Sequence, residues 1–457
     1  MRILHTSDWH LGKRLNQFSR IEEQRQVLDE IVEIADRQTV DLVVITGDLF
    51  DSFVPPVEAQ ELFYATLKRL SLNGRRPVIA IAGNHDSADT IQAPDPLARL
   101  HGIVLAGYPN LQLPGFTTDG NVRIEFPHRG LLRLIFPDDE TPPVHIIATP
   151  YANERRFFQV FRDLEKPDGA DQDVVQQLTL FWKRAAESHF SSDSVNILLG
   201  HMFCISSGSD GDGDENNTQT SELIEPEDEK PILYPGGLPP VPAGSFPAGT
   251  QYAALGHLHR KQRVMHDPFP VWYPGSPLAY SKSEAEQKKY VLCVDLEPGT
   301  EAIVHEVELR SGRSILRPRV RGVENALDWL KKNQEPFVEM TIELDTYLSS
   351  KDRRRLYEAH PRLLTLVPEL ASVVQEEEGA HIDVNRPIQE LFGAYFAAKY
   401  GGSSPPRDLV ELFNEVMAGQ EEAEDAEDVE PGREPEPEED GLNAEEKDAG
   451  LSGGGGV

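Results

Sequence analysis

The chain has 457 residues and a formal net charge of −33, with 39% hydrophobic and 26% charged residues. This length exceeds that of one ordinary domain and predicts two or three domains. The chain contains no run of about 20 apolar residues, which excludes a membrane-spanning helix, and its first residues do not resemble a secretory signal. The two cysteines, Cys204 and Cys293, have no CxxC partner, so we expect a reducing cytoplasm and neither a disulfide framework nor a cysteine metal site.

Much of the negative charge is concentrated in two segments. Residues 421–448 contain fifteen acidic residues against two basic ones, and residues 210–230 contain nine against one. Together they account for 21 of the 33 net negative charges. Carboxylates repel phosphates, so the acidity argues against a nucleic-acid ligand, but a cleft in the remaining sequence need not be acidic. The net charge therefore does not exclude nucleic-acid binding.

The order of apolar patterns predicts the domain organisation. Over residues 1–285, apolar runs alternate with helix-like stretches, which predicts an α/β domain. Within it, residues 206–231 lack apolar periodicity and predict a long, acidic, mobile loop. The strand-like runs KKYVLCVDL and VEMTIEL and the helix-like KDRRRLYEAH predict a smaller α+β domain over 286–375. Apolar residues at helical spacing predict two amphipathic helices within 385–418, and the acidic, glycine-ended residues 420–457 are predicted to be disordered.

Five apolar runs each end in residues of the types that bind metals. The runs ILHTSDWH, DLVVITGD, VIAIAGNHD, VNILLGH and YAALGHLH end, in this order, in Asp8 and His10; Asp48; Asn84, His85 and Asp86; His201; and His257 and His259. Buried parallel strands have continuous apolar sequences, and ligand sites in α/β proteins lie at the carboxyl ends of strands. Five strands in one sheet system would therefore bring these side chains to a common rim.

The types of these residues indicate a site for two divalent metal ions. Carboxylate and amide oxygens mixed with imidazoles suit Mn²⁺, Fe or Zn²⁺, and the absence of thiolate argues against a purely soft site. Two ions about 3.5–4 Å apart need a shared carboxylate, and Asp48 is the aspartate that stands alone after its strand. A histidine without a metal can protonate or stabilise the leaving oxygen. His85, next to Asp86, is the natural candidate.

Each cluster also has a purely structural explanation. A Gly-Asp or Gly-Asn-His-Asp sequence can form a turn, and a histidine at a strand end is often only hydrogen-bonded. Five clusters that all follow apolar runs nevertheless favour the metal site. The histidines at 5, 101, 145 and 360 lack this context, and we interpret them as structural residues.

The series DWHLG, GDLFD, GNHD, GH and GHLH resembles the calcineurin-like metallophosphoesterase superfamily. Leu11-Gly12 after the first motif is typical of its repair-nuclease branch, and GDLFDS lacks the arginine-containing extension of protein Ser/Thr phosphatases. The segments PGGLPPVPAGSFPAGTQYAALGHLHRKQ and YPGSPLAYSKSE are similar to the SbcD family, the nuclease subunits of SbcCD complexes. The resemblance extends from Met1 to about Met417, without the acidic loop. It implies a metallophosphoesterase β-sandwich flanked by helices, a small cap domain and a C-terminal helical segment that binds a partner.

The resemblance also implies a set of ligands and an activity. One metal ion, Mn²⁺ in the family, would be held by Asp8, His10, Asp48 and His259. The other would be held by Asp48, Asn84, His201 and His257, so that Asp48 bridges. His85 would be the transition-state residue, oriented by Asp86. The implied reaction is ATP-dependent hydrolysis of DNA, as a double-strand 3′–5′ exonuclease and a single-strand or hairpin endonuclease, in DNA repair, replication and recombination. Because Asp51 stands where archaeal and eukaryotic relatives often carry a histidine, we expect no second catalytic histidine.

The implied partners are DNA and an SMC-like ATPase of the SbcC type, with two copies of this chain in a heterotetramer and a cytoplasmic, nucleoid-associated location. The two C-terminal helices would bind the ATPase coiled coil, or alternatively pack on the cap domain. Residues that flank the site segments are candidates for DNA contacts: Lys13, Arg14, Arg155, Arg156, Arg260, Lys261, Gly275 and Ser276. A second set of candidates lies in the cap, namely the arginines at 310, 313, 317, 319, 321 and 353–355. For each of these residues, a place on the solvated surface explains the sequence about as well as a contact with DNA.

Two other functions remain open at this point. A small-molecule phosphodiesterase or nucleotidase on the same core would explain the metal motifs but not the segments after about residue 290. A non-catalytic scaffold is expected to have lost metal ligands, whereas this chain has the complete set and His85.

Overall fold

The computed structural model describes residues 1–138, 140–152, 156, 174–206, 238–370, 388–399, 405, 409–410 and 413–414. The chain divides into two compact units, Met1–Leu370 and Ala371–Val457. Apart from Ser206, the acidic loop expected at 206–231 lies outside the described residues, as does the tail expected at 420–457. Among the helices in the described ranges, none has the length and apolar character needed to cross a membrane.

A six-stranded sheet forms the first half of a β-sandwich in the first unit. Its strand order is β18-β17-β1-β4-β5-β6, with β1, β4, β5 and β6 parallel and the last two strands in sequence antiparallel at one edge. The strands are β1 (Arg2–Thr6), β4 (Leu42–Thr46), β5 (Val78–Ile81), β6 (Ile103–Ala106), β17 (Lys289–Asp295) and β18 (Ile303–Leu309). Every residue of β4, β5 and β6 is buried, as expected for parallel strands covered on both faces.

An eight-stranded sheet forms the second half. Its order is β15-β16-β14-β11-β10-β9-β8-β7, and the central strands β16, β14, β11 and β10 are parallel. The strands are β7 (Phe116–Thr117), β8 (Arg123–His128), β9 (Leu131–Ile135), β10 (Val144–Thr149), β11 (Val195–His201), β14 (Tyr252–Gly256), β15 (Gln262–Met265) and β16 (Val271–Tyr273).

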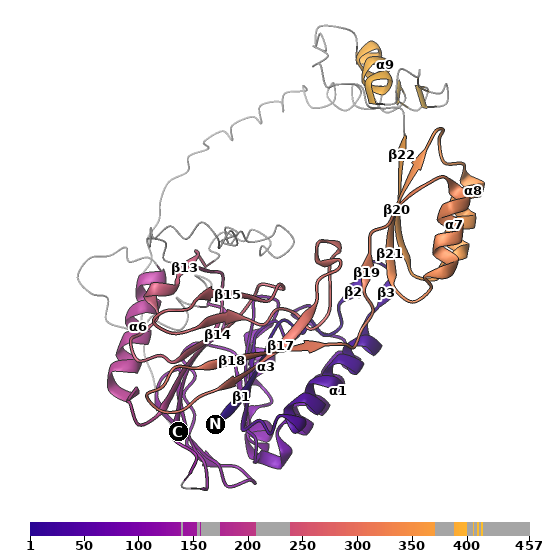
Figure 1. Ribbon diagram of the computed structural model, residues 1–457. Coiled ribbons are helices and arrows are strands. Elements are labelled where there is room, and N and C mark those ends of the chain that lie inside the picture. The colour runs from indigo at the N-terminus through magenta and orange to yellow at the C-terminus, as the bar shows by residue number, and fades with distance from the viewer. Residues whose placement is uncertain are drawn as a thin grey trace, which may run out of the picture. The chain divides into compact units, whose positions relative to one another are not determined.

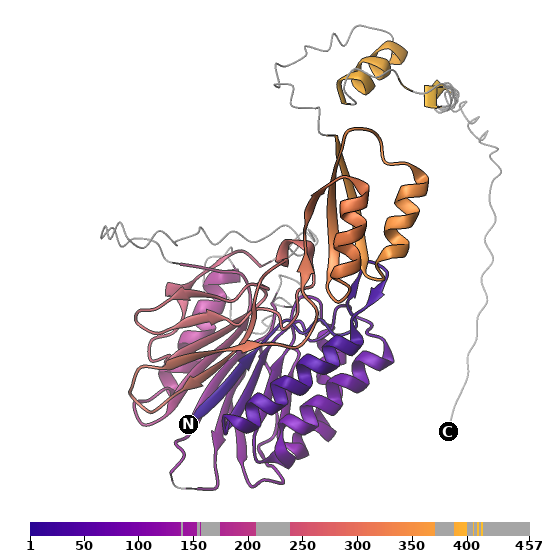
Figure 2. The ribbon, with the colours of Figure 1, turned by 45° about the vertical axis from the view of Figure 1, so that its right-hand side comes forward.

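The two sheets pack face to face, with helices on both outer faces. Alternate residues of each strand fill the common core, for example Ile3 of the first sheet and Ile197 of the second. The residues between them face outward, and α1 (Ile21–Arg37) and α2 (Val57–Leu70) lie side by side over the outer face of the first sheet (Figure 2). Helix α6 (Val174–His189) covers the second sheet on the opposite side (Figure 1). The predicted α/β fold, a β-sandwich flanked by helices, is confirmed.

His5 is buried at the interface of the two sheets, as a structural histidine. Its Nε2 lies 3.1 Å from the Leu255 carbonyl oxygen and 3.0 Å from Thr46 Oγ1, and its Nδ1 lies 2.9 Å from Tyr252 Oη. Because a carbonyl oxygen can only accept, Nε2 carries the proton and Nδ1 accepts from the tyrosine hydroxyl. His5 therefore contributes to the fold as a neutral imidazole.

The neutral state of His5 predicts a loss of stability in acid. Burial lowers the pKa of His5 to about 3, whereas an unfolded histidine has a pKa of about 6.5. The unfolded chain thus binds the extra proton first, and the stabilisation is complete above pH 6.5 and is lost as the pH falls towards 3. Between about pH 7.5 and about pH 5.5 we expect this residue to lower the free energy of unfolding by about 1.4 kcal/mol. Denaturant unfolding at both pH values should show a smaller difference in His5→Gln than in wild type; equal differences would refute the assignment.

A smaller parallel sheet with two helices completes the first unit. Strand β21 (Phe337–Leu344) pairs with β19 (Ile315–Leu316), β20 (Arg319–Arg321) and β22 (Leu363–Leu370), and α7 (Val323–Lys332) and α8 (Ser350–Ala359) pack on it. The boundary expected at 285 is wrong, because β17 pairs with β1 and β18 pairs with β17 in the six-stranded sheet. The run KKYVLCVDL therefore belongs to the sandwich, and we place the boundary after Leu309. The smaller domain, from 310 to 370, is called the cap below.

In the second unit, α9 (Ile388–Lys399) lies at the position predicted for the first C-terminal helix. The rings of Phe392 and Phe413 stack with centroids 4.1 Å apart and planes inclined by 8°. Residues 409–410 and 413–414, which include Phe413, are helical. The two predicted helical segments therefore contact each other.

Candidate metal centre

The predicted ligands lie at the carboxyl ends of strands from both sheets or in the loops that follow them. Strands β1, β4 and β5 belong to the six-stranded sheet and precede Asp8 and His10, Asp48, and Asn84; β11 and β14 belong to the eight-stranded sheet and lead to His201, and to His257 and His259. The expectation of a single sheet system was therefore wrong in its topology. The ligands still meet, because the sheets pack face to face with these ends on the same rim.

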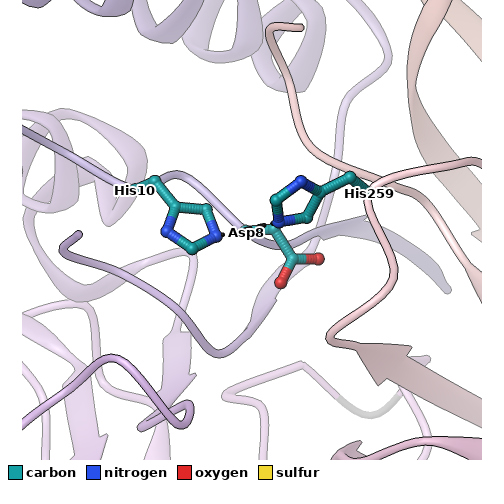
Figure 3. A group of neighbouring side chains, drawn as sticks. All are labelled: Asp8, His10 and His259. Atoms are coloured by element: carbon teal, nitrogen blue, oxygen red, sulfur yellow. Dashed lines mark hydrogen bonds between the residues drawn. The ribbon is translucent and has the colours of Figure 1, made fainter. Parts of the chain in front are cut away.

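Asp8, His10 and His259 form a first cluster (Figure 3). All three side chains are buried, and their ligand atoms lie within 4.8 Å of one another. The two imidazole rings meet edge-on, with planes inclined by 72° and their Nε2 atoms 3.0 Å apart. A buried carboxylate beside two imidazole nitrogens suits a divalent metal ion of intermediate softness.

Asn84, His201 and His257 form a second cluster. Asn84 Oδ1 lies 2.8 Å from His201 Nε2 and 3.1 Å from His257 Nδ1. His201 Nδ1 is 2.8 Å from the Thr46 carbonyl oxygen, to which it donates. This hydrogen bond fixes the tautomer and leaves Nε2 as the nitrogen that can bind a metal.

Asp48 lies between the two clusters. Its Oδ2 is 3.5 Å from His10 Nε2 of the first cluster and 3.5 Å from His201 Nε2 of the second. Its Oδ1 accepts a hydrogen bond of 2.8 Å from the His85 backbone N–H. Asp48 is thus placed as a shared ligand requires.

Four of these residues have a left-handed backbone. The φ angles are 53° at Asp8, 42° at His10, 47° at Asp48 and 113° at His257. Such conformations cost of order 1–3 kcal/mol each in residues other than glycine, and they gather at functional sites. The surrounding fold therefore holds the backbone of these four residues in a strained conformation.

Two glycines allow the loops to approach closely. A Cβ on Gly47, whose φ is +92°, would lie 2.1 Å from His201 Nδ1, and one on Gly83 would lie 2.1 Å from Asp48 Oδ1. Any larger residue at either position would displace a ligand. These glycines thus make room for the predicted ligands.

The electrostatics of the two clusters favour a bound cation. Burial raises the pKa of Asp8. Burial acts on Asp48 in the same direction, but the imidazoles around it, His201 first, outweigh this effect and hold the pKa of Asp48 well below its usual range. Burial also acts to lower the pKa of His201, but Asp48 outweighs it and raises that pKa to about 9. The ionised Asp48 therefore draws positive charge to a buried position where a divalent ion fits.

His85 lies beside the clusters. Its ring centroid is 4.8 Å from that of His10, and its Nδ1 is 3.1 Å from the Asp51 carbonyl oxygen. Nδ1 must donate to this oxygen, so Nε2 is the nitrogen available for proton transfer. His85 also forms a third group with His10 and the Asp51 carboxylate whose ligand atoms lie within 4.8 Å.

The expectation that Asp86 orients His85 is wrong. The Asp86 carboxylate accepts backbone N–H groups, from Leu49 at 3.0 Å, Phe50 at 2.9 Å and Gly83 at 2.8 Å. Burial and the nearby Asp48 raise the pKa of Asp86 to about 6, against these hydrogen bonds. Asp86 therefore joins two ligand loops, and the backbone of Asp51 orients the imidazole.

Among the residues near the site that are predicted to contact DNA, some are exposed and others already bind protein groups. Arg14 and Arg260 are exposed, whereas Lys13 donates to Asp51 Oδ1 at 2.8 Å. Arg156 donates to the backbone carbonyls of Gly83, at 3.0 Å, and of Asp86, and so supports the loop of Asn84. Lys261 pairs with Glu306 and lies 4.0 Å above the centroid of the Tyr290 ring. Arg155 lies outside the described residues.

Gly275 and Ser276 face the protein interior. Ser276 is fully buried, and its hydroxyl lies 2.8 Å from the Leu278 carbonyl oxygen and 3.1 Å from Glu284 Oε2. A Cβ on Gly275 would lie 2.6 Å from the His259 carbonyl oxygen. The predicted phosphate contact is wrong for Ser276, because burial excludes it from DNA; the dipeptide instead packs against the His259 loop.

Most cap arginines predicted to face DNA are paired with acidic residues. The pairs are Arg313–Glu23 (3.7 Å), Arg317–Glu339 (2.8 Å), Arg319–Glu343 (2.6 Å), Arg319–Glu369 (2.5 Å), Arg321–Asp345 (3.2 Å), Arg354–Glu358 (2.8 Å) and Arg355–Glu324 (2.9 Å). Each exposed pair contributes little to stability, but it cancels the charge of its arginine. Six of the eight cap arginines are thus paired with an acidic residue, and their contact with DNA stays a prediction.

Sequence reasoning missed Glu284. This buried carboxylate lies 3.2 Å from His259 Nδ1. Burial acts to raise its pKa, but Lys289 and His259 outweigh burial and hold the pKa of Glu284 below its usual range. The pattern Ser281-x-x-Glu284 predicts a capping box, which is present, but it gives no sign that the turn lies behind a metal ligand.

Comparisons with known proteins identify the family of the chain. Residues 1–225 match the family model of the calcineurin-like phosphoesterases. Over 434 residues the chain is 36% identical to the SbcD subunit of the nuclease SbcCD from Bacillus subtilis (strain 168), covering 93% of this chain and 100% of that protein. It is 28% identical over 441 residues to the SbcD subunit from Escherichia coli (strain K12), with the same coverage. The chain therefore belongs to the SbcD family of nuclease subunits, within the calcineurin-like phosphoesterases.

Proposed function

We propose that the chain is the nuclease subunit of an SbcCD-type complex and hydrolyses DNA phosphodiester bonds with two divalent ions, Mn²⁺ in the working enzyme. It acts as a double-strand 3′–5′ exonuclease and as a single-strand or hairpin endonuclease, with an SbcC-type ATPase as its partner. The observation that carries the proposal is the convergence of oxygen and imidazole donors from two sheets on the shared Asp48.

The residues around the centre have distinct roles in this proposal. The first cluster and Asp48 would hold one ion, and the second cluster and Asp48 would hold the other. When bound, such ions neutralise the phosphate oxygens and lower the pKa of a water molecule. His85, with Nδ1 directed to the Asp51 carbonyl, presents Nε2 to the leaving oxygen and protonates or stabilises it. Arg14 and Arg260 contact the DNA backbone, because they are exposed and flank ligand loops.

The proposal also includes the assembly. Two copies of the chain and two of the ATPase form a heterotetramer in the cytoplasm, associated with the nucleoid. Exposed apolar side chains support a protein contact near the site: Phe53, Val54 and Val57 are 53%, 87% and 69% exposed. Helix α9 and its neighbour bind the base of the ATPase coiled coil.

Cleavage of an end-labelled DNA hairpin tests the nuclease proposal. The wild-type chain should cut the hairpin with Mn²⁺ and the ATPase partner, and should not cut it when the metal is chelated. A small phosphodiester, bis-p-nitrophenyl phosphate, serves as the control substrate. Turnover of the small phosphodiester without any cutting of DNA would contradict the nuclease proposal and favour a small-molecule phosphodiesterase.

A further inference from the structure

One short turn reaches both the metal centre and the cap. The 3₁₀ turn η4 (Lys282–Glu284) follows Ser281, which closes a capping box with Glu284. Glu284 faces the interior and lies against His259, whereas Lys282 reaches the cap, where its Nζ donates to Glu339 Oε1 and Thr365 Oγ1, both at 2.8 Å. Opposite ends of a three-residue turn thus contact a metal ligand and the cap sheet.

The hydrogen bonds of Glu284 leave its carboxylate little freedom. Its Oε1 accepts from the backbone N–H groups of Tyr280 and Ser281, both at 3.0 Å, as well as from His259 Nδ1. Its Oε2 accepts from Lys289 Nζ, which also donates to the His259 carbonyl oxygen at 3.1 Å. A carboxylate that accepts from Nδ1 fixes the tautomer of the imidazole, directs Nε2 to the metal and makes it more basic.

The same region also holds the loop of Asp8 and His10. Tyr280, next to the turn, donates its hydroxyl to the Trp9 carbonyl oxygen, and Gln24 Nε2 donates to the His10 carbonyl oxygen at 2.8 Å. Around the turn, an apolar cluster joins the sandwich to the cap; its buried members are Leu15, Ala279, Ile315, Phe337 and Leu364. In Figure 1, β2 (Arg14–Leu15) and β3 (Phe18–Ser19) lie at the base of the cap sheet, near β19 and β21.

The second cluster has a different support. His201 Nδ1 donates to the Thr46 carbonyl oxygen at the end of β4, and Asn84 follows β5. Both supports belong to the sandwich. A displacement of the cap would therefore act first on the cluster of Asp8, His10 and His259.

We propose that the turn 281–284 is a positioning element that couples the cap to the first metal cluster: Glu284 orients His259, and Lys282 ties the same turn to the cap sheet. This inference rests on the proposed two-metal function, because it requires that the first cluster binds an ion. Glu284 acts through His259 and does not contact the substrate. A shift of the cap, whatever moves it, then changes the metal affinity of one cluster and leaves the other cluster unchanged.

Titration of the full-length chain with Mn²⁺, followed by the electron paramagnetic resonance signal of the free ion, tests this proposal. Wild type should bind two ions tightly. Glu284→Gln should weaken one of the two sites by about 10–100-fold, the usual effect of removing such a partner of a metal ligand, and should leave the other site unchanged. Glu308→Gln is the matched control, because Glu308 also pairs with a lysine, Lys288 at 3.1 Å, but on the surface.

Lys282→Met tests the link to the cap separately. It should weaken the same site as Glu284→Gln by a smaller factor, whereas Lys288→Met should leave both sites at their wild-type affinity. If Glu284→Gln does not fold, the partly exposed Lys282 still provides the test. Wild-type affinity at both sites in Lys282→Met would overturn the coupling, and wild-type affinity in Glu284→Gln would overturn the positioning role. A wild-type chain that binds no Mn²⁺ would instead overturn the proposed function.

Discussion

Replacing Asp48 with asparagine is expected to abolish tight binding of a second metal ion and to lower phosphodiester turnover on the order of 10³-fold. Oδ2 of Asp48 lies 3.5 Å from one imidazole of each cluster, which places this carboxylate between the two clusters. The amide keeps the shape of the side chain but removes the negative charge that the surrounding imidazoles stabilise. Calorimetric titration with Mn²⁺ and turnover of bis-p-nitrophenyl phosphate measure the two effects.

The control for this variant is Asp41→Asn. Asp41 also accepts a backbone N–H, that of Arg2 at 2.7 Å, but it lies at the start of β4, at the opposite end from the ligands. This substitution should leave the metal stoichiometry and the turnover unchanged. If Asp48→Asn still binds two ions with wild-type affinity, Asp48 is not the shared ligand.

Replacing His85 with glutamine is expected to lower kcat by about 10²–10⁴-fold, the usual contribution of a general acid or base. Metal affinity should stay at the wild-type value, because neither cluster needs the His85 side chain. Glutamine retains hydrogen-bonding capacity towards the Asp51 carbonyl, but it cannot transfer a proton at neutral pH. The expected result is thus a separation between metal binding and turnover.

Hairpin cleavage under single-turnover conditions, together with Mn²⁺ titration, measures this separation. His101→Gln is the control, because His101 is partly exposed, lies 3.7 Å from Asp119 and belongs to none of the groups of metal-ligand atoms. A parallel loss of metal affinity in His85→Gln would show that His85 binds a metal, in the group that it forms with His10 and Asp51. Cleavage by His85→Gln at the wild-type rate would show that His85 takes no part in the reaction.

The candidate ligands could be identified from the sequence because each of their motifs is local. An apolar strand, a glycine and a ligand follow one another within a few residues, as in the run from Leu42 to Asp48. The arrangement of strands into two sheets was not predictable, because it depends on pairing between distant segments. Strand β17 illustrates this. It pairs with β1, nearly 290 residues earlier in the chain, and its local sequence does not show to which domain it belongs.

The errors within the site have a similar cause. Asp86 is adjacent to His85 in sequence, but adjacent side chains in a loop point in different directions, and the Asp86 carboxylate bonds to the backbone of another loop. Ser276 follows a glycine and resembles a phosphate-binding position, whereas burial in the fold excludes that role. The cap arginines resemble a basic surface in sequence, but the structure pairs most of them with acidic residues, such as Glu343 on the neighbouring strand for Arg319. For Asp86 and for Arg319 the deciding contact is between residues that are not neighbours in the chain.

The electron paramagnetic resonance spectrum of the wild-type chain loaded with Mn²⁺ tests the two-metal centre most directly. The proposed function predicts two bound ions per chain with Asp48 as their shared ligand; two ions so close together would give the spectrum of a spin-coupled pair. A single bound ion, or two ions with the spectra of isolated Mn²⁺, would contradict the shared-ligand arrangement.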